Sequence, residues 1–262
     1  MVDERNVSGR PLAGSAWLET HHRAKLPERR AFCERLARLS PARVVDLGCA
    51  TGLWLEELDK VLPTTCEFVG LDSDEAALDE ANRRARSWGR SMTFRHVDVD
   101  SADADIPEAD LTLAFSLSPY LARLDQLLSS LAERPGSVAV RQYDGALIRF
   151  GPMSGEDRSL IEMSLQGSVG SSGQFRHYDL DRVLAAIEAA GFEHHEIGFE
   201  LFERTAPFHP ETAAYLEATV AWTLKHISEV ARERLEVWWR ARARDPAIPT
   251  YVVEVELAAL LS

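Results

Sequence analysis

No apolar run in the 262-residue sequence approaches the roughly twenty residues that are needed to cross a bilayer. The first ten residues are charged and lack the apolar core of a signal peptide. Together these absences predict a cytoplasmic protein that has no membrane partner.

Cysteine is scarce, and its spacing fits no metal site. Cys33, Cys49 and Cys66 are odd in number and are not paired at the short intervals of zinc ligands, which favours free thiols over disulfides or zinc. One run of acids lacks the glycine and the final glutamate of a calcium loop; it consists of Asp98, Asp100, Asp103 and Asp105. We therefore predict no metal.

Positive charge is also in short supply. The chain has 29 Lys and Arg against 42 Asp and Glu, a formal net charge of -13. Its arginines are interleaved with acids, so the sequence predicts no nucleic-acid partner. A hydrophobic fraction of 45% with 27% charged residues is that of an ordinary globular protein. The length fits a single domain over residues 1–262, as a monomer or homodimer.

The chain lacks the glycines of a dinucleotide-binding turn. That turn, G-x-G-x-x-G, would need glycine at positions 48, 50 and 53, where the sequence has Gly48, Ala50 and Leu53. The surrounding pattern is still that of a strand, a tight turn and a helix, because a short apolar run ends near Asp46 and apolar residues at helical spacing follow. Gly48 and Gly52 allow the backbone to approach a ligand closely.

This turn resembles the first motif of class I S-adenosylmethionine-dependent methyltransferases, in which an acid precedes three glycines at alternate positions. Asp46, Gly48 and Gly52 match, and Ala50 replaces the middle glycine. The resemblance implies S-adenosylmethionine as the cofactor. Asp72 ends the next apolar strand, close to the spacing of about twenty residues at which an acid binds ribose hydroxyls in nucleotide-binding folds.

The family implies further cofactor contacts at the later strand ends. Asp98 would accept the adenine amino group and Val99 would cover the ring. Asp72 could instead cap the following helix, although Ser73 or Asp74 could serve as that cap. The predicted cofactor-binding residues are Trp17, Asp46, Gly48, Cys49, Ala50, Gly52, Asp72, Ser73, Asp98, Val99 and Ser116.

The order of the apolar segments predicts an α/β fold. Strands are expected at 43–47, 66–72, 92–97, 110–116, 137–143, 192–202 and 251–257, with helical patterns between most of them. The resemblance implies a doubly wound, Rossmann-like sheet of seven strands, mostly parallel with an antiparallel last strand, and helices on both faces.

Two helical regions flank this pattern. Residues 1–40 could form a lid over the cofactor, although a helix with one apolar and one charged face is the default interpretation. Residues 207–245 would be an insertion of about two helices before the last strand. Packing against the sheet is the default role of the insertion, with a dimer contact or a wall of the substrate pocket as alternatives.

The acceptor is the least explicit feature of the sequence. We expect the segment 143–178 to be irregular and to form the acceptor pocket together with the N-terminal helix. His177 is the first candidate for a general base, ahead of Tyr143 and His96. The function predicted is methylation of a small molecule, for example O-methylation in secondary metabolism. The alternatives are a cofactor-binding protein of the same fold without methyl transfer and, disfavoured by the missing glycines, a nicotinamide-dependent oxidoreductase.

Overall fold

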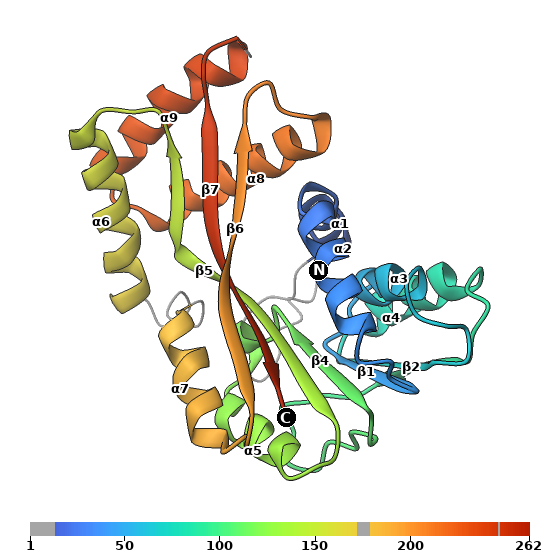
Figure 1. The fold of residues 1–262 in the computed structure, drawn as a ribbon. Coiled ribbons are helices and arrows are strands. Elements are labelled where there is room, and N and C mark those ends of the chain that lie inside the picture. The colour runs from blue at the N-terminus through green and yellow to red at the C-terminus, as the bar shows by residue number, and fades with distance from the viewer. Residues whose placement is uncertain (1–13, 172–178, 246) are drawn as a thin grey trace. The chain divides into compact units, whose positions relative to one another are not determined.

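The computed structural model describes residues 14–171, 179–245 and 247–262. Its strands form one seven-stranded sheet in the order β3-β2-β1-β4-β5-β7-β6 (Figure 1). The strands are β1 (Arg43–Leu47), β2 (Glu67–Asp72), β3 (Met92–His96), β4 (Leu111–Phe115), β5 (Ser137–Gly151), β6 (His195–Thr205) and β7 (Tyr251–Leu261). This order confirms the predicted doubly wound fold. The seven strands also follow one another along the chain as expected.

The sheet is parallel from β3 to β5 and antiparallel at its other end. β1 pairs in parallel with β2 and β4, and β4 pairs in parallel with β5. His194 and Ser262 exchange both backbone hydrogen bonds, at 2.8 and 2.9 Å, next to β6 and β7. Exchanged pairs of this kind are the pattern of antiparallel strands, so the last hairpin is as predicted.

The chain divides into two compact units. Unit 1 comprises Met1–Gln142, Asp181–Gly198 and Ala258–Ser262, and unit 2 comprises Tyr143–Leu180 and Phe199–Leu257. The boundaries fall within β5, β6 and β7 and after the first residue of α7. That the whole chain works as a single domain stays a prediction.

In unit 1, three helices pack on one face of the parallel strands. These are α2 (Leu26–Ala37), α3 (Leu53–Asp59) and α4 (Glu75–Ala85), and Figure 1 shows α3 and α4 beside β1 and β2. The core cluster that they share with the strands contains Phe32, Leu36, Val44, Leu55, Leu58, Phe68, Leu78, Leu111, Leu113 and Phe115. The alternate residues of β4 in this set point to one face, as the period of a strand requires.

Two helices of unit 1 are tied to the loop after β4. That loop contains a short 3-10 turn, η1 (Ser118–Tyr120), and leads to α5 (Leu124–Ala132). Arg182, near the start of α7 (Leu180–Ala190), donates from Nη1 to Ser118 O at 2.8 Å and from Nη2 to Leu121 O at 2.6 Å. The last long helix predicted before β6 is therefore present and anchored by main-chain oxygens. Before the sheet, α1 (Ser15–Ala24) precedes α2.

Unit 2 corrects the prediction of an irregular segment at 143–178. β5 continues to Gly151, with Ile148 and Phe150 buried and Leu147 and Arg149 exposed between them. That alternation is typical of a half-buried strand. The expected end of the strand at residue 143 was wrong because Asp144 and Gly145, which often form turns, here lie within the strand.

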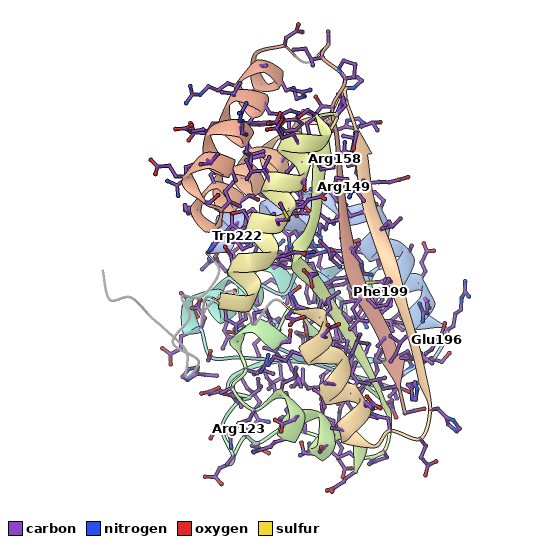
Figure 2. The ribbon with its side chains drawn as sticks, turned by 90° about the vertical axis from the view of Figure 1, so that its left-hand side faces the viewer. Arg123, Arg149, Arg158, Glu196, Phe199 and Trp222 are labelled. Carbon is purple, nitrogen blue, oxygen red and sulfur yellow. The ribbon has the colours of Figure 1, made fainter. Side chains whose placement is uncertain are left out.

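A helix, α6 (Gly155–Ser171), follows this strand and was also missed. Ser154 Oγ accepts a hydrogen bond from Asp157 N at 3.0 Å and donates to Asp157 Oδ2 at 2.8 Å. Ser154 thus caps the start of α6 through its side chain, and the sequence signal, Ser followed three residues later by an acid, was visible. Arg149 on β5 pairs with Glu162 on α6 at 2.8 Å, and Arg149 and Arg158 lie on the same side of unit 2 (Figure 2).

The predicted two-helix insertion is present in unit 2. It consists of α8 (Pro210–His226) and α9 (Glu229–Arg244), between β6 and β7. Tyr215 of α8 donates its hydroxyl to the Glu254 carboxylate of β7 at 2.6 Å, which supports the packing role. None of the helices in the described ranges is long and apolar enough to span a membrane.

Candidate cofactor site at the carboxyl ends of the parallel strands

Most predicted cofactor residues follow neighbouring parallel strands at one edge of the unit 1 sheet. The glycine turn follows β1, Asp72 ends β2, Asp98 comes two residues after β3, and Ser116 follows β4 directly. Open α/β sheets bind ligands at this edge. The fold therefore brings together side chains that are far apart in the sequence.

The glycine turn has a left-handed backbone at three of its positions. Gly48, Ala50 and Gly52 have φ of 69°, 45° and 76°. The amides of Gly48 and Cys49 donate to Leu71 O at 2.8 and 3.0 Å, so the turn is fastened to the end of β2. A Cβ at position 48 would come within 2.7 Å of Leu117 Cδ1. The left-handed backbone favours glycine at position 48, and a side chain there would also displace the end of Leu117.

Asp72 joins the turn to the second strand. Its Oδ2 accepts from Ala50 N at 2.7 Å, and its Oδ1 accepts from Asp74 N at 2.9 Å. Asp74, in turn, caps α4 by accepting from Ala77 N at 3.1 Å. The helix cap is therefore Asp74, and Asp72 is left at the strand end, as the ribose interpretation requires. Burial raises the pKa of Asp72, with its backbone hydrogen bonds acting in the opposite direction.

Asp46 is a deeply buried acid below the turn. It is 2% exposed, and burial followed by the charge of Asp72 raises its pKa well above the usual range. Burial likewise raises the pKa of Cys49. Burial of this kind disfavours the charged form of a carboxyl group. Cys49 is by the same reasoning a neutral, unreactive thiol.

The segment after β3 forms a separate part of the site. Val99 is buried, and Asp98 Oδ1 accepts from Asp100 N at 3.0 Å. Asp100 accepts from Ala122 N and Arg123 N, each at 3.0 Å, at the start of α5. Asp100 thus has a structural role, while Asp98 lies partly exposed at the strand end.

Ser116 is a further left-handed residue at this edge. Its φ is 52°, and its amide donates to Arg141 O at 2.7 Å. Non-glycine residues in this conformation cluster at functional sites. Its geometry agrees with its predicted place beside the cofactor.

The remaining predicted residues are placed less clearly. Trp17 lies on α1 and stacks on His21, with ring centroids 5.8 Å apart. Tyr143 lies within β5 as the first residue of unit 2. His177 and most of the surrounding aromatic and polar stretch fall outside the described residues. His96 donates from Nε2 to the backbone oxygen of Ser73, 3.0 Å away, so it has a structural partner.

The residues of the turn fit S-adenosylmethionine as the cofactor. Thr51 Oγ1 is buried and has no hydrogen-bond partner within the described ranges, which leaves a polar atom in the turn itself. Asp72 and the peptide groups of the turn supply charge and main-chain hydrogen bonds at one place. Among the described residues, no group of three or more His, Cys, Asp or Glu side chains could hold a metal.

The sequence interpretation missed a buried cationic cluster beside the turn. Arg29 of α2 lies over the ring of Trp54 with its Cζ 4.6 Å from the centroid, and Arg141 of β5 lies 5.6 Å from the same ring. An arginine in the middle of a buried strand was the available signal, because charged residues are rarely buried there without a purpose.

The comparisons with known proteins agree with this geometry. Residues 44–134 match the family described as "Methyltransferase domain". A carboxy-S-adenosyl-L-methionine synthase from a Nitratiruptor species is 44% identical over 59 residues, 22% of this chain and 25% of that protein. A trans-aconitate 2-methyltransferase from Methylobacterium nodulans is 35% identical over 121 residues, 44% of this chain and 45% of that protein. The chain thus spans between a quarter and just under half of the length of these curated relatives.

Solved structures extend the likeness to the whole fold. A type II methyltransferase structure from Anaeromyxobacter dehalogenans aligns with a TM-score of 0.57 at 18% identity, covering 88% of this chain and 94% of that one. The YcgJ protein from Bacillus subtilis aligns with a TM-score of 0.55 at 11% identity, covering 90% and 97%. At such identities the likeness concerns the fold.

The fold is that of the Rossmann-like methyltransferases, and the matched residues 44–134 run from β1 to just past α5. Residues 44–134 thus match a methyltransferase domain, and the fold around them is like that of solved methyltransferase structures. The resemblance predicted from the glycine turn is confirmed by this match and by the fold, and S-adenosylmethionine is the cofactor that such a domain implies.

Proposed function

We propose that this protein transfers a methyl group from S-adenosylmethionine to a small-molecule acceptor. The observation that carries the proposal is the link between the glycine turn and the second strand, made by Asp72 and Ala50 N at 2.7 Å. When bound, S-adenosylmethionine supplies an electrophilic methyl group, whose bond to sulfur breaks as the acceptor bonds to the methyl carbon and the sulfur keeps the electron pair. The chain's own task is to bind, align and exclude water.

The position of each proposed residue at a strand end indicates which part of the cofactor it would contact. Asp72 would accept from the ribose hydroxyls, and the amides of the turn would face the rest of the cofactor. Asp98 would accept from the adenine amino group, with Val99 against the ring. The full proposed set is Trp17, Asp46, Gly48, Cys49, Ala50, Gly52, Asp72, Ser73, Asp98, Val99 and Ser116.

The acceptor assignment rests on chemistry rather than on a described contact. If the acceptor nucleophile is a hydroxyl, a base must take its proton, and His177 or Tyr143 is proposed for that role. The net charge of -13 argues against a nucleic-acid acceptor. A relative named for methylation of trans-aconitate supports a small molecule. O-methylation in secondary metabolism is one form that this reaction would take.

In a second candidate function, the protein binds the cofactor but does not transfer its methyl group. Relatives with up to 44% identity over the matched residues are named carboxy-S-adenosyl-L-methionine synthase, so proteins with a similar segment carry a different activity in their names. The protein would then bind S-adenosylmethionine and serve another reaction or a binding role.

The proposal extends to the organisation of the chain. The 262 residues would work as one methyltransferase domain, with residues 1–40 as a lid and 207–245 as an insertion before the last strand. The protein would be cytoplasmic, and its oligomeric state would be a monomer or a homodimer.

Substitution of two nearby acids tests the cofactor assignment. Asp72→Ala should weaken binding of S-adenosylhomocysteine by on the order of 1.5 to 3 kcal/mol, because charge-assisted hydrogen bonds are lost. Asp74→Ala, the matched control, removes the helix cap and should leave affinity nearly unchanged. Isothermal calorimetry measures both, and equal affinities would show that Asp72 does not hold the ribose.

Turnover separates the two candidate functions. Folded wild-type protein that binds S-adenosylmethionine should convert it to S-adenosylhomocysteine in the presence of a methyl acceptor from a panel of small hydroxy, amino and carboxylic compounds. Conversion of the cofactor into a different product would favour the second candidate.

A further inference from the structure

Unit 2 contains a groove between α6 and the strands β5 and β7. Its volume is about 440 Å³, and its lining includes Leu147, Arg149, Glu162, Tyr251, Val253 and Val255. Pockets that bind small molecules commonly have volumes of roughly 300 to 1,000 Å³. All of the lining residues belong to unit 2, so the groove is a feature of this unit alone.

Alternate residues of the strands make the floor of the groove apolar. Tyr251, Val253 and Val255 of β7 are partly exposed, and the residues between them are buried. Side chains two apart on a strand point to the same face, so these three share the face that lines the groove. Leu147 of β5 adjoins them and is 43% exposed. Apolar side chains that gather at an open surface are typical of a binding site.

One face of α6 borders the groove. Arg158, Glu162 and Gln166 are four residues apart, which places them on one face of the helix. The Glu162 carboxylate accepts two hydrogen bonds from Arg149 of β5, at 2.8 and 3.3 Å. Because these two opposite charges offset each other, they bring no net charge to the groove.

Arg158 is the cation of this face that has no acidic partner among the residues that the structure describes. Its side chain is half-buried, and its Nε is buried without a hydrogen-bond partner in the described ranges. The adjacent Asp157 lies 3.6 Å from Arg234 instead. Arg158 lies near Arg149 in unit 2 (Figure 2). A cation that is partly withdrawn from water is stabilised by an anion that pairs with it.

Tyr251 provides a second polar group at the end of the groove. Its hydroxyl lies 3.4 Å from Arg158 Nη2. A Cβ at Gly151 would come within 2.2 Å of Tyr251 Cζ, so the tyrosine ring lies directly on the backbone of β5. A guanidinium and a phenol side by side can donate to the two oxygens of one carboxylate. The single charge of a carboxylate also balances the single charge of Arg158, whereas a phosphate monoester would bring up to two.

We propose that the groove of unit 2 binds an amphiphilic carboxylate. The carboxylate accepts hydrogen bonds from Arg158 and Tyr251, and the apolar chain lies over Leu147, Val253 and Val255. The site is separate from the proposed cofactor residues, which lie in unit 1, and it does not depend on methyl transfer.

The test uses the full chain and four probes that separate the apolar chain from the head group. Octanoate carries both, acetate carries only the carboxylate, octan-1-ol carries the chain with a neutral head, and octyl phosphate carries the chain with a different anion. Isothermal calorimetry below the critical micelle concentration gives each affinity. Octanoate should bind, and acetate and octan-1-ol should each bind at least about tenfold more weakly, because each lacks one of the two kinds of contact.

Three variants locate the bound carboxylate. Arg158→Gln should weaken octanoate by about tenfold or more, which corresponds to one charge-assisted hydrogen bond. Tyr251→Phe keeps the ring on Gly151 and should weaken octanoate by about threefold, because a neutral hydrogen bond is lost. Arg240→Gln is the matched control: Arg240 of α9 is 65% exposed and pairs with Glu236, so this variant loses the same charge and should bind octanoate as the wild type does. S-adenosylhomocysteine should bind all three variants with unchanged affinity.

Four results would overturn the proposal. The first is a wild-type protein that gives no binding heat with octanoate, and the second is equal affinity for octanoate and octan-1-ol. Octyl phosphate that binds more tightly than octanoate would overturn the carboxylate assignment. Octanoate affinity that is unchanged in both Arg158→Gln and Tyr251→Phe would place the ligand elsewhere. A dimer that octanoate dissociates, measured by sedimentation velocity, would show that a second copy of the chain occupies the groove instead.

Discussion

Ala50 is the one residue of the glycine turn that departs from the family pattern, and its backbone shows a cost. It adopts φ of 45°, whereas Gly48 and Gly52 on either side adopt the same region without a side chain. A non-glycine residue in the left-handed region destabilises the folded chain by roughly 1 to 2 kcal/mol. That cost is offset in part because alanine restricts the unfolded chain more than glycine does.

Ala50→Gly should therefore leave the free energy of unfolding unchanged or raise it by up to about 1 kcal/mol. The control is Ala31→Gly, at an exposed position inside α2, which should lose about 1 kcal/mol because glycine weakens a helix interior. Urea denaturation measures both changes. Equal losses in the two variants would show that Ala50 is not strained.

The residues of the cofactor half could be predicted because their signals are local. An acid before small residues marks the turn, and Asp72 and Asp98 each follow an apolar run that ends at the same edge of the sheet. For the pair of buried arginines, the only local signal was the position of Arg141 within an apolar strand. Arg29 and Arg141 are 112 positions apart in number, and only the packing of α2 against β4 and β5 brings both toward Trp54.

At the scale of elements, the strands and helices of unit 1 and the two helices α8 and α9 were predictable from apolar periodicity. The continuation of β5 to Gly151 and the helix α6 were not recognised, because glycine and serine are frequent there and favour loops on average. Here the strand continues because Ile148 and Phe150 are buried and alternate with exposed residues. The helix begins because Ser154 caps it. Local hydrogen bonding and burial decided the structure where composition did not.

The first helix makes stability depend on pH through His22. Burial first, and Arg29 second, lower the pKa of His22 from 6.5 to about 3. Between these two values the unfolded chain binds a proton that the folded chain does not, so the free energy of unfolding falls as the pH falls below 6.5. Above 6.5 the contribution is complete and constant.

His22→Gln should flatten this dependence, because glutamine keeps an acceptor for Arg29 but does not titrate. Between pH 7 and pH 4 the variant should lose less stability than the wild type, by on the order of 1 to 3 kcal/mol. His96→Gln, whose side chain is 55% exposed in the wild type, is the control and should follow the wild-type curve. Denaturant titrations across this pH range give the answer, and parallel curves for all three proteins would contradict the prediction.

On the scale of the whole molecule, neither unit is continuous in sequence. Unit 1 consists of three segments and unit 2 of two, and β5, β6 and β7 each contribute residues to both. The residues that are proposed to bind the cofactor all lie in unit 1. Because the chain enters unit 2 twice before unit 1 is complete, we expect the two units to unfold together.

Scanning calorimetry with S-adenosylhomocysteine tests this expectation. A ligand that binds only the folded chain, at a hundred times its dissociation constant, adds about 2.7 kcal/mol of stability, which should raise the melting temperature by on the order of 5 to 10 °C. If the units unfold together, one transition should be present and the whole of it should shift, although the proposed ligand contacts lie in unit 1. Asp72→Ala at the same ligand concentration should shift less. Two transitions, of which only one responds to the ligand, would instead show that unit 2 unfolds as a separate domain.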